Sequence, residues 1–188
     1  MKKSFLTRWF NLSASSRRPE TTESLAQQGV AEAQFSLGLR YASGNGAAPD
    51  YVQAEHWYRK AAGQNHALAS FNLGMMNANG HGMPADRAKA LVWIQRAADL
   101  GDAGAQFNLG STHHRAVMDG VAENVSQSRI DAYKWFCLAA AQGYQGAAVA
   151  GEVVNLYMSR ADVMEGCRRI AAFHSGQAES KADFAAKL

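Results

Sequence analysis

The chain has 188 residues, of which 47% are hydrophobic and 19% are charged, a balance typical of folded proteins and not of disordered ones. This length is enough for one domain with a continuous core. Only three prolines occur, alanine is abundant, and no run of β-branched residues alternates with polar ones, so we predict an all-α fold. The uncharged apolar stretches are shorter than the roughly 18 residues that a membrane-spanning helix needs.

Residues 1–22 are predicted to form a flexible basic arm. The first 19 residues carry five positive charges and no acid, which leaves 14 basic and 16 acidic residues for the remainder and a net charge there of −2. Because the folded part lacks a basic face, we expect no nucleic-acid partner. A secretion signal is disfavoured because Arg8 interrupts its apolar part. Contact of the arm with an anionic membrane is an alternative to a mobile tail, which we favour.

Two short signatures recur along the chain with a spacing of 36 residues. The first reads AEAQFSLG, ALASFNLG and AGAQFNLG, and it begins at Ala31, Ala67 and Ala103. The second combines an alanine, an aromatic pair or its equivalent, and a further alanine pair, as in AEHWYRKAAGQNH (54–66). Its third copy begins 42 residues after the second, so the third unit contains six additional residues. Such a period predicts a helical-repeat protein.

The repeats define the expected domain organisation. We predict a solenoid over residues 23–173, followed by a C-terminal cap or tail over 174–188; its units span about 31–66, 67–102, 103–144 and a degenerate 145–173. In the degenerate unit, Val149 replaces the phenylalanine and Glu152 replaces the final glycine of the first signature. Its second half keeps the alanine pair Ala171 and Ala172, and Cys167 takes the place of a core tryptophan, so we expect Cys167 to be buried. Atypical terminal units are a common way to close such a stack.

Each half of a unit is predicted to form one helix. Ala33, Leu37 and Tyr41 recur every four residues and give the first helix an apolar stripe. Gly38 and its equivalents are expected to allow neighbouring helices to approach closely. The connecting segments, such as SGNGAAPD (43–50), contain a glycine suited to a positive φ at the end of the first helix and a Pro-Ala-Asp or Pro-Asp sequence suited to the start of the second. These glycines follow a helix, so they do not indicate a nucleotide-binding loop.

The units resemble Sel-1-like repeats, relatives of the tetratricopeptide repeat, in their AxAQFxLG opening, GxGxxP turn, AxxW core and AAxxG close. The resemblance covers about residues 24–173. It implies a right-handed superhelix of antiparallel helix pairs whose first helices line a concave face, in an adaptor for other proteins that is common in bacteria. A secreted branch of the family joins each helix pair by a disulfide. This chain has no cysteine pair within a repeat, so we expect a cytoplasmic location, with a periplasmic or envelope-associated one as the alternative.

The sequence offers little evidence for catalysis, a metal or a cofactor. His113 and His114 are adjacent, so on a helix they point about 100° apart, whereas two ligands on one face require a spacing of four. Cys137 falls in the middle of a core helix and is not expected to act as a nucleophile. We therefore predict a non-enzymatic protein with no cofactor.

The resemblance to tetratricopeptide repeats suggests a peptide-binding groove on the first helices. An aromatic ladder and the positions four residues later would face it, with polar residues at its edge: Phe35, Phe71, Phe107, Leu39, Met75, Ser111, Asn79, His114 and Arg115. Met75 would be an adaptable contact. The alternative is that the phenylalanines pack between adjacent first helices and are largely buried; the sequence leaves both open.

The expected function is a protein-interaction adaptor that binds another protein or peptide on this face. An inhibitor or immunity protein of a bacterial toxin is the alternative within that class. An enzyme or ligand binder acting on cell-wall-related small molecules is the alternative from another class. The insertion within residues 118–131 would either tune binding or simply lengthen the first helix or a surface loop.

Overall fold

The computed structural model describes residues 21–44 and 48–185, with side chains up to Gln177. Within this part of the chain every regular element is a helix, which confirms the all-α prediction. Residues 1–20 of the predicted basic arm lie outside the described residues, and Thr22, predicted as its last residue, begins α1. The helices are α1 (Thr22–Gln27), α2 (Ala31–Ser43), α3 (Tyr51–Gly63), α4 (Ala67–Asn79), α5 (Arg87–Asp99), α6 (Ala103–Met118), α7 (Val125–Ala141), α8 (Ala147–Asn155) and α9 (Arg160–Ala185).

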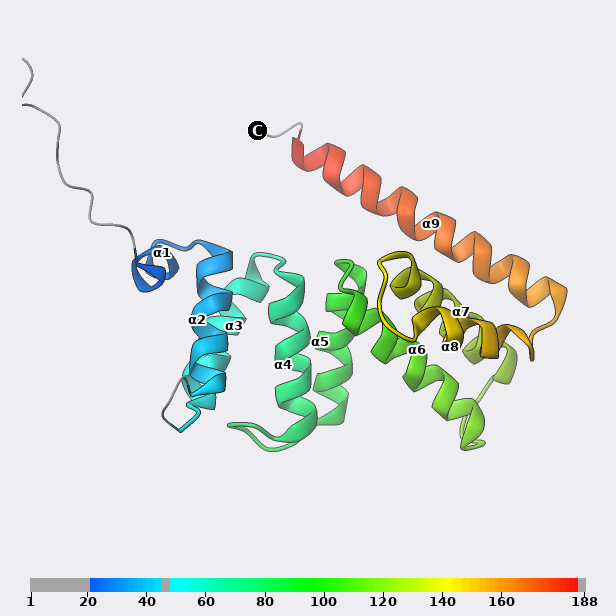
Figure 1. The fold of residues 1–188 in the computed structure, drawn as a ribbon, viewed down its shortest axis with the longest axis horizontal. Helices are drawn as coiled ribbons and strands as arrows, with labels where there is room; N and C mark the ends of the chain where they lie inside the picture. Colours follow the sequence, from blue (N-terminus) through cyan, green and yellow to red (C-terminus); the bar gives the residue numbers. More distant parts are fainter. Residues whose placement is uncertain (1–20, 45–47, 186–188) are drawn as a thin grey trace, which may run out of the picture.

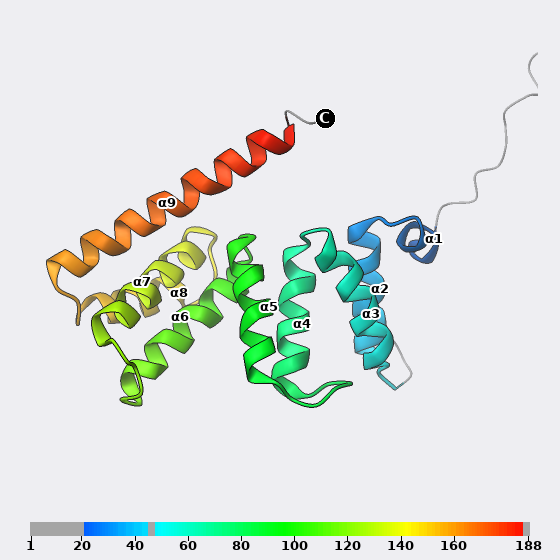
Figure 2. The same cartoon turned by 180° about the vertical axis from the view of Figure 1, so that it is seen from behind.

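The helices from α1 to α8 stack in chain order into an α-solenoid (Figure 1). Each first helix, α2, α4 or α6, packs most extensively against the second helix that follows it, and each second helix also contacts the next first helix. The last helix, α9, departs from this order and runs back along α7, as both views show (Figures 1 and 2). None of the described helices is long and apolar enough to cross a membrane.

The helix boundaries follow from the turn chemistry that the sequence predicted. Gly44 and Gly80 end α2 and α4 with φ values of 73° and 72°, which glycine adopts without steric cost. The carboxylates of Asp50 and Asp86 then accept hydrogen bonds of 3.0 Å from the backbone N–H groups of Gln53 and Lys89. These bonds satisfy donors that the first turn of α3 or α5 leaves unpaired.

The glycine near the middle of each first helix permits direct contact with the second helix. A β-carbon added to Gly38 would lie 2.6 Å from the ring of Tyr58, and one added to Gly74 would lie 2.6 Å from Ile94. At Gly110 the same atom would lie 2.7 Å from the ring of Phe136. All three distances are shorter than van der Waals contact, so the expected close approach of the helices is confirmed and depends on glycine.

Successive units are also joined by hydrogen bonds to equivalent carbonyl groups. The carbonyl oxygens of Ala26, Ala62 and Ala98, each 36 residues apart, lie near the ends of helices that precede a new unit. The Gln34 amide donates to the first at 3.1 Å, the Arg96 guanidinium to the second at 2.9 Å, and the Gln106 amide to the third at 3.2 Å. Each joint thus gains a side-chain hydrogen bond to a helix-terminal carbonyl that also accepts a backbone N–H of the turn that follows it.

The fourth unit does not form the expected helix pair. Glu152 occupies the position that Gly110 holds in the third unit, and its side chain is exposed on α8. A second helix cannot approach that surface as closely as α7 approaches Gly110. The chain instead leaves α8 and packs α9 mainly against α7, where Gly166 lies against the ring of Tyr133.

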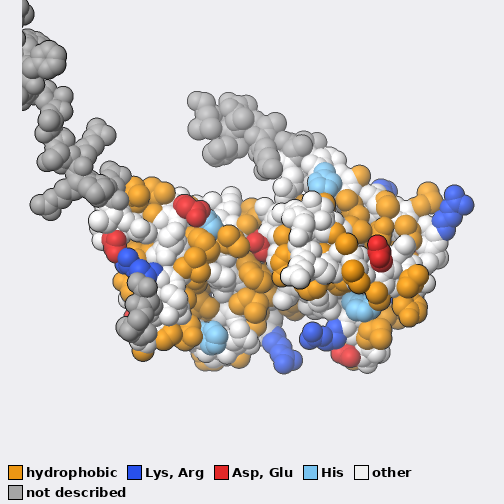
Figure 3. Space-filling model, in the orientation of Figure 1, with side chains coloured by type: hydrophobic (Ala, Val, Ile, Leu, Met, Phe, Trp, Pro, Cys, Tyr) orange, Lys and Arg blue, Asp and Glu red, His pale blue; other side chains and the backbone are white. Residues whose placement is uncertain are grey.

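This arrangement corrects the prediction for the C-terminal region. Cys167, expected in the core, is exposed, as are both residues of the alanine pair, Ala171 and Ala172. The helix also continues without interruption past residue 174, where the solenoid was expected to end. The apolar stripe of α8 consequently has no second helix over it, and it exposes Val149, Val153 and Leu156. Figure 3 shows hydrophobic side chains gathered over this end of the molecule.

Both apolar and charged contacts hold α9 in place. Its residues Ile170 and Phe173 pack against the core cluster that includes Trp135 of α7. The Arg169 guanidinium lies 2.7 Å from Asp131 of α7 and 2.7 Å from Glu165 of α9. Farther along, the side-chain amide of Gln177 donates a 2.8 Å hydrogen bond to the backbone carbonyl of Asp99, at the end of α5.

We expect the charge of Glu165 to make stability dependent on pH in the acid range. Hydrogen bonds from Arg168 and Arg169 lower the pKa of Glu165 from 4.5 to about 2. A carboxyl whose pKa is lower in the folded state stabilises the fold above its unfolded pKa and loses this contribution as pH falls toward the folded value. Urea denaturation should therefore show that Glu165→Gln costs less stability at pH 3 than at pH 5. An equal cost at both values would contradict the prediction.

The six-residue insertion lengthens helices. The helix α6 has 16 residues and α7 has 17, whereas α2, α3, α4 and α5 have 13 each. The connection between α6 and α7 is restricted to residues 119–124. The prediction of a longer first helix is therefore confirmed, and the second helix is longer as well; an effect of the insertion on binding stays a prediction.

Candidate functional site

Three hollows follow one another along the first helices. Each is formed by one first helix, the second helix of the same unit, and the next first helix. The first hollow has a volume of about 390 Å³ and lies between α2 and α4; its lining includes Leu39, Tyr51, Asn72, Met75 and Asn79. The middle hollow, of about 470 Å³, lies between α4 and α6, and the third, of about 230 Å³, lies between α6 and α8. Met75 lines both the first and the middle hollow, so these two adjoin.

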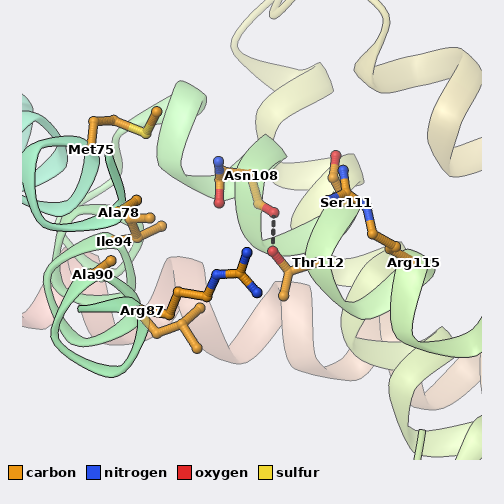
Figure 4. Close-up of a pocket in the computed structure, with 10 residues that line it drawn as sticks. Met75, Ala78, Arg87, Ala90, Ile94, Asn108, Ser111, Thr112 and Arg115 are labelled. Atoms are coloured by element: carbon orange, nitrogen blue, oxygen red, sulfur yellow. Dashed lines mark hydrogen bonds between the residues drawn. The ribbon is translucent and has the colours of Figure 1, made fainter. Parts of the chain in front are cut away.

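The middle hollow has one apolar and one polar wall (Figure 4). The apolar side is formed by Met75 and Ala78 of α4 with Ala90, Leu91 and Ile94 of α5. The polar side comes from α6 and consists of Asn108, Ser111, Thr112 and Arg115. In Figure 4, Arg87 extends from α5 across the hollow toward α6. The Thr112 hydroxyl donates a 2.9 Å hydrogen bond to the backbone carbonyl of Asn108. A ligand here would meet both apolar surface and polar side chains, as in most binding pockets.

The repeat places equivalent residues in each hollow. Asn72 and Asn108, the second residue of each FNLG sequence, are 36 positions apart and line the first and middle hollows. Tyr51, Arg87 and Arg129 are likewise equivalent, and each lines one of the three hollows. The hollows are therefore variations of one site that the repeat produces at every joint.

The structure brings together six of the nine residues that the sequence predicted for the groove. Leu39, Met75 and Asn79 line the first hollow; Met75, Ser111 and Arg115 line the middle one; His114 lines the third. Sequence reasoning missed both asparagines and Arg87. Asparagine recurs at the second position of the FNLG sequence, and this recurrence could have indicated Asn72 and Asn108.

The three phenylalanines are not among the residues that line these hollows. Phe35 is buried, and its ring stacks on His66 at 4.5 Å between centroids. Phe71 packs against the core cluster that includes Trp135. The ring of Phe107 packs against that of Phe136, with 5.4 Å between the ring centroids. The rings of the aromatic ladder thus pack within and between units, but Phe71 and Phe107 are only half-buried, and the groove contact predicted for them stays a prediction. Each first helix therefore buries two sides, one against the second helix of its own unit and one against the next unit.

The side chains considered for catalysis or metal binding do not form a site among the residues that the structure describes. In the described part of the chain, no group of three His, Cys, Asp or Glu side chains could hold a metal ion. Cys137 is half-buried, and burial raises the pKa of its thiol, which disfavours the reactive thiolate. The neighbouring Tyr133 has a pKa raised to about 12, first by burial and then by Cys137 and Cys167. Both effects favour neutral side chains packed between α7 and α9.

Comparison with known proteins agrees with the repeat pattern. The model of the Sel1 repeat matches residues 31–66, 67–102 and 103–144. Among solved structures, a Sel1 repeat protein from Oxalobacter formigenes is similar, with 34% sequence identity and a TM-score of 0.58 over 70% of this chain and 94% of that one. A protective antigen of uropathogenic Escherichia coli that displays an SLR fold has 19% identity and a TM-score of 0.48, over 89% of this chain and 50% of that one. No curated protein matches the sequence. The chain belongs to the Sel1 repeat family.

Proposed function

We propose that the chain is a non-catalytic adaptor that binds an extended segment of a partner protein along its row of hollows. Sel1 repeat proteins generally mediate protein–protein interactions, and their fold is typically a non-catalytic scaffold. The observation that carries the proposal is the continuity of the first and middle hollows through Met75. An open row of adjoining hollows fits a chain segment that passes along it.

The two asparagines support this mode of binding. Each amide group has both a donor and an acceptor, which is the combination that a peptide backbone requires from its partner. Asn72 and Asn108 lie at the same position of successive units, so they would meet the backbone of one segment at two points. Met75 between them offers a flexible, polarisable surface for an apolar side chain.

The proposal predicts that peptide binding depends on Asn108 and Met75. Dodecapeptides selected from a random phage-displayed library against the full chain should bind Asn108→Ala and Met75→Ala about fivefold more weakly, as expected for the loss of about 1 kcal/mol of hydrogen bonding or apolar contact. Fluorescence anisotropy with labelled synthetic peptides measures this change.

Val92→Ala is the matched control, because Val92 is 68% exposed on α5 and lines none of the three hollows. It should leave affinity unchanged. Peptides that bind all variants equally, or a selection that yields no specific peptide, would contradict the proposal.

A further inference from the structure

We infer that the middle hollow selects a segment with an acidic side chain, Asp or Glu, held between Arg87 and Arg115 beside an apolar residue seated on Met75. This inference rests on the proposed function and names the chemistry of the partner at that site. Arg87 of α5 and Arg115 of α6 both line this hollow; in Figure 4, Arg87 extends toward α6, and Arg115 lies on α6 beside Ser111.

Both arginines lack a counter-ion among the side chains that the structure describes. The ion pairs formed by those residues include neither Arg87 nor Arg115. No Asp or Glu is among the residues that line the middle hollow. Asp119, the acid nearest to Arg115 in sequence, forms no ion pair with it in the described part of the chain. The acid next to Arg87, Asp86, accepts the Lys89 backbone hydrogen bond at 3.0 Å and lies 3.1 Å from the Lys89 ammonium group. Its negative charge is thus already paired outside the hollow.

The other two hollows show what normally occupies these positions. In the first hollow, the equivalents of Arg87 and Arg115 are Tyr51 and Asn79, and Tyr51 stacks on His81 at 4.7 Å. In the third hollow, Arg129 lies over the ring of Tyr157 at 5.9 Å, and this tyrosine is the equivalent of Arg115. Only in the middle one of the three does a cation occupy both positions.

Two cations on opposite walls repel each other, and an anion between them removes this cost and gains charge-assisted hydrogen bonds. A carboxylate suits the site best because guanidinium groups bind it through paired N–H donors. Residues 20–188, with Arg87 and Arg115 included, carry 14 basic and 16 acidic side chains and a net charge of −2, so this local positive charge is a property of the hollow and not of the whole surface. An acidic side chain is favoured over a terminal carboxylate because the segment must continue toward the first hollow past Met75.

The test uses peptides selected against the full chain as above. The selected sequences should be enriched in Asp or Glu next to an apolar residue. Arg87→Gln and Arg115→Gln should each weaken binding about tenfold, as expected for hydrogen bonds to a charged group. Replacing the acidic side chain of the peptide by its amide should weaken binding by the same factor. When this peptide is tested against either arginine variant, no further loss of affinity should follow. Affinity should also decrease with added salt.

Arg59→Gln is the matched control. It removes one positive charge from α3, where Arg59 pairs with Glu55 at 2.7 Å, and it should leave binding unchanged. Amidation of the peptide C-terminus should have no effect; a loss there would show that the hollow binds a terminal carboxylate and would overturn the inference. Peptides that respond to Asn108→Ala and Met75→Ala but not to the arginine variants would support the groove and overturn the acidic ligand. The absence of any peptide that depends on the hollows would overturn both.

Discussion

Phe136→Ala should lower the free energy of unfolding by about 4 kcal/mol, the cost typical of removing a buried phenylalanine. The ring is 2% exposed and lies where three helices meet. It contacts Gly110 and Phe107 of α6, and it packs with Val154 of α8 in one core cluster. Its removal would leave a cavity that joins the third unit to α8, and helices fixed by contacts on their other sides cannot collapse into it.

Urea denaturation followed by circular dichroism measures this loss. Tyr157→Ala is the matched control, since this aromatic residue follows α8, is 63% exposed and should change stability by no more than about 0.5 kcal/mol. A loss below about 1 kcal/mol for Phe136→Ala would show that the joint between α6, α7 and α8 can repack without its aromatic ring.

Gly110→Ala should lower the free energy of unfolding by about 2 kcal/mol, although alanine is the better helix former. The added β-carbon would lie 2.7 to 3.0 Å from three ring atoms of Phe136, so α6 and α7 must move apart. Overpacking of this kind costs about 1–3 kcal/mol or more, partly offset by the gain in helix propensity. The same urea denaturation measures the change.

Gly63→Ala isolates the propensity effect. Gly63 ends α3 with nothing within 4 Å of an added β-carbon, so its replacement should be neutral or stabilise by about 0.5 kcal/mol. In the Phe136→Ala background, Gly110→Ala should lose most of its cost, because the ring that it would clash with is gone. A cost that persists there would place the strain elsewhere than at this contact.

The repeated part of the fold could be predicted because its causes are local. Gly44, Asp50 and Gly110 act within a turn or across one helix pair, so a 36-residue period in the sequence reports them directly. The degenerate unit could not be predicted in the same way. Glu152 was visible as a substitution for glycine, but its consequence depends on how closely a second helix must approach, and that distance is set by packing.

The candidate site was predicted in part, through the resemblance to tetratricopeptide repeats. That resemblance placed Met75 and Ser111 in the groove and Arg115 at its edge, and all three line a hollow. The same resemblance placed Phe71 in the groove. In the structure, however, each first helix buries a second side against the next unit. Arg87 belongs to a different helix, and only the stacking of three helices brings it to the hollow.

The attachment of α9 also affects how the molecule comes apart. A solenoid in which each unit touches only its neighbours can unfold from either end, one unit at a time. The hydrogen bond from Gln177 to the carbonyl of Asp99 links residues 78 positions apart and spans from the last helix to α5. The core cluster shared by α5, α6, α7 and α9 joins the same elements. We therefore expect the chain from α5 onward to unfold as one block and α1, α2 and α3 to open alone, so that the basic arm is attached to the end that opens first.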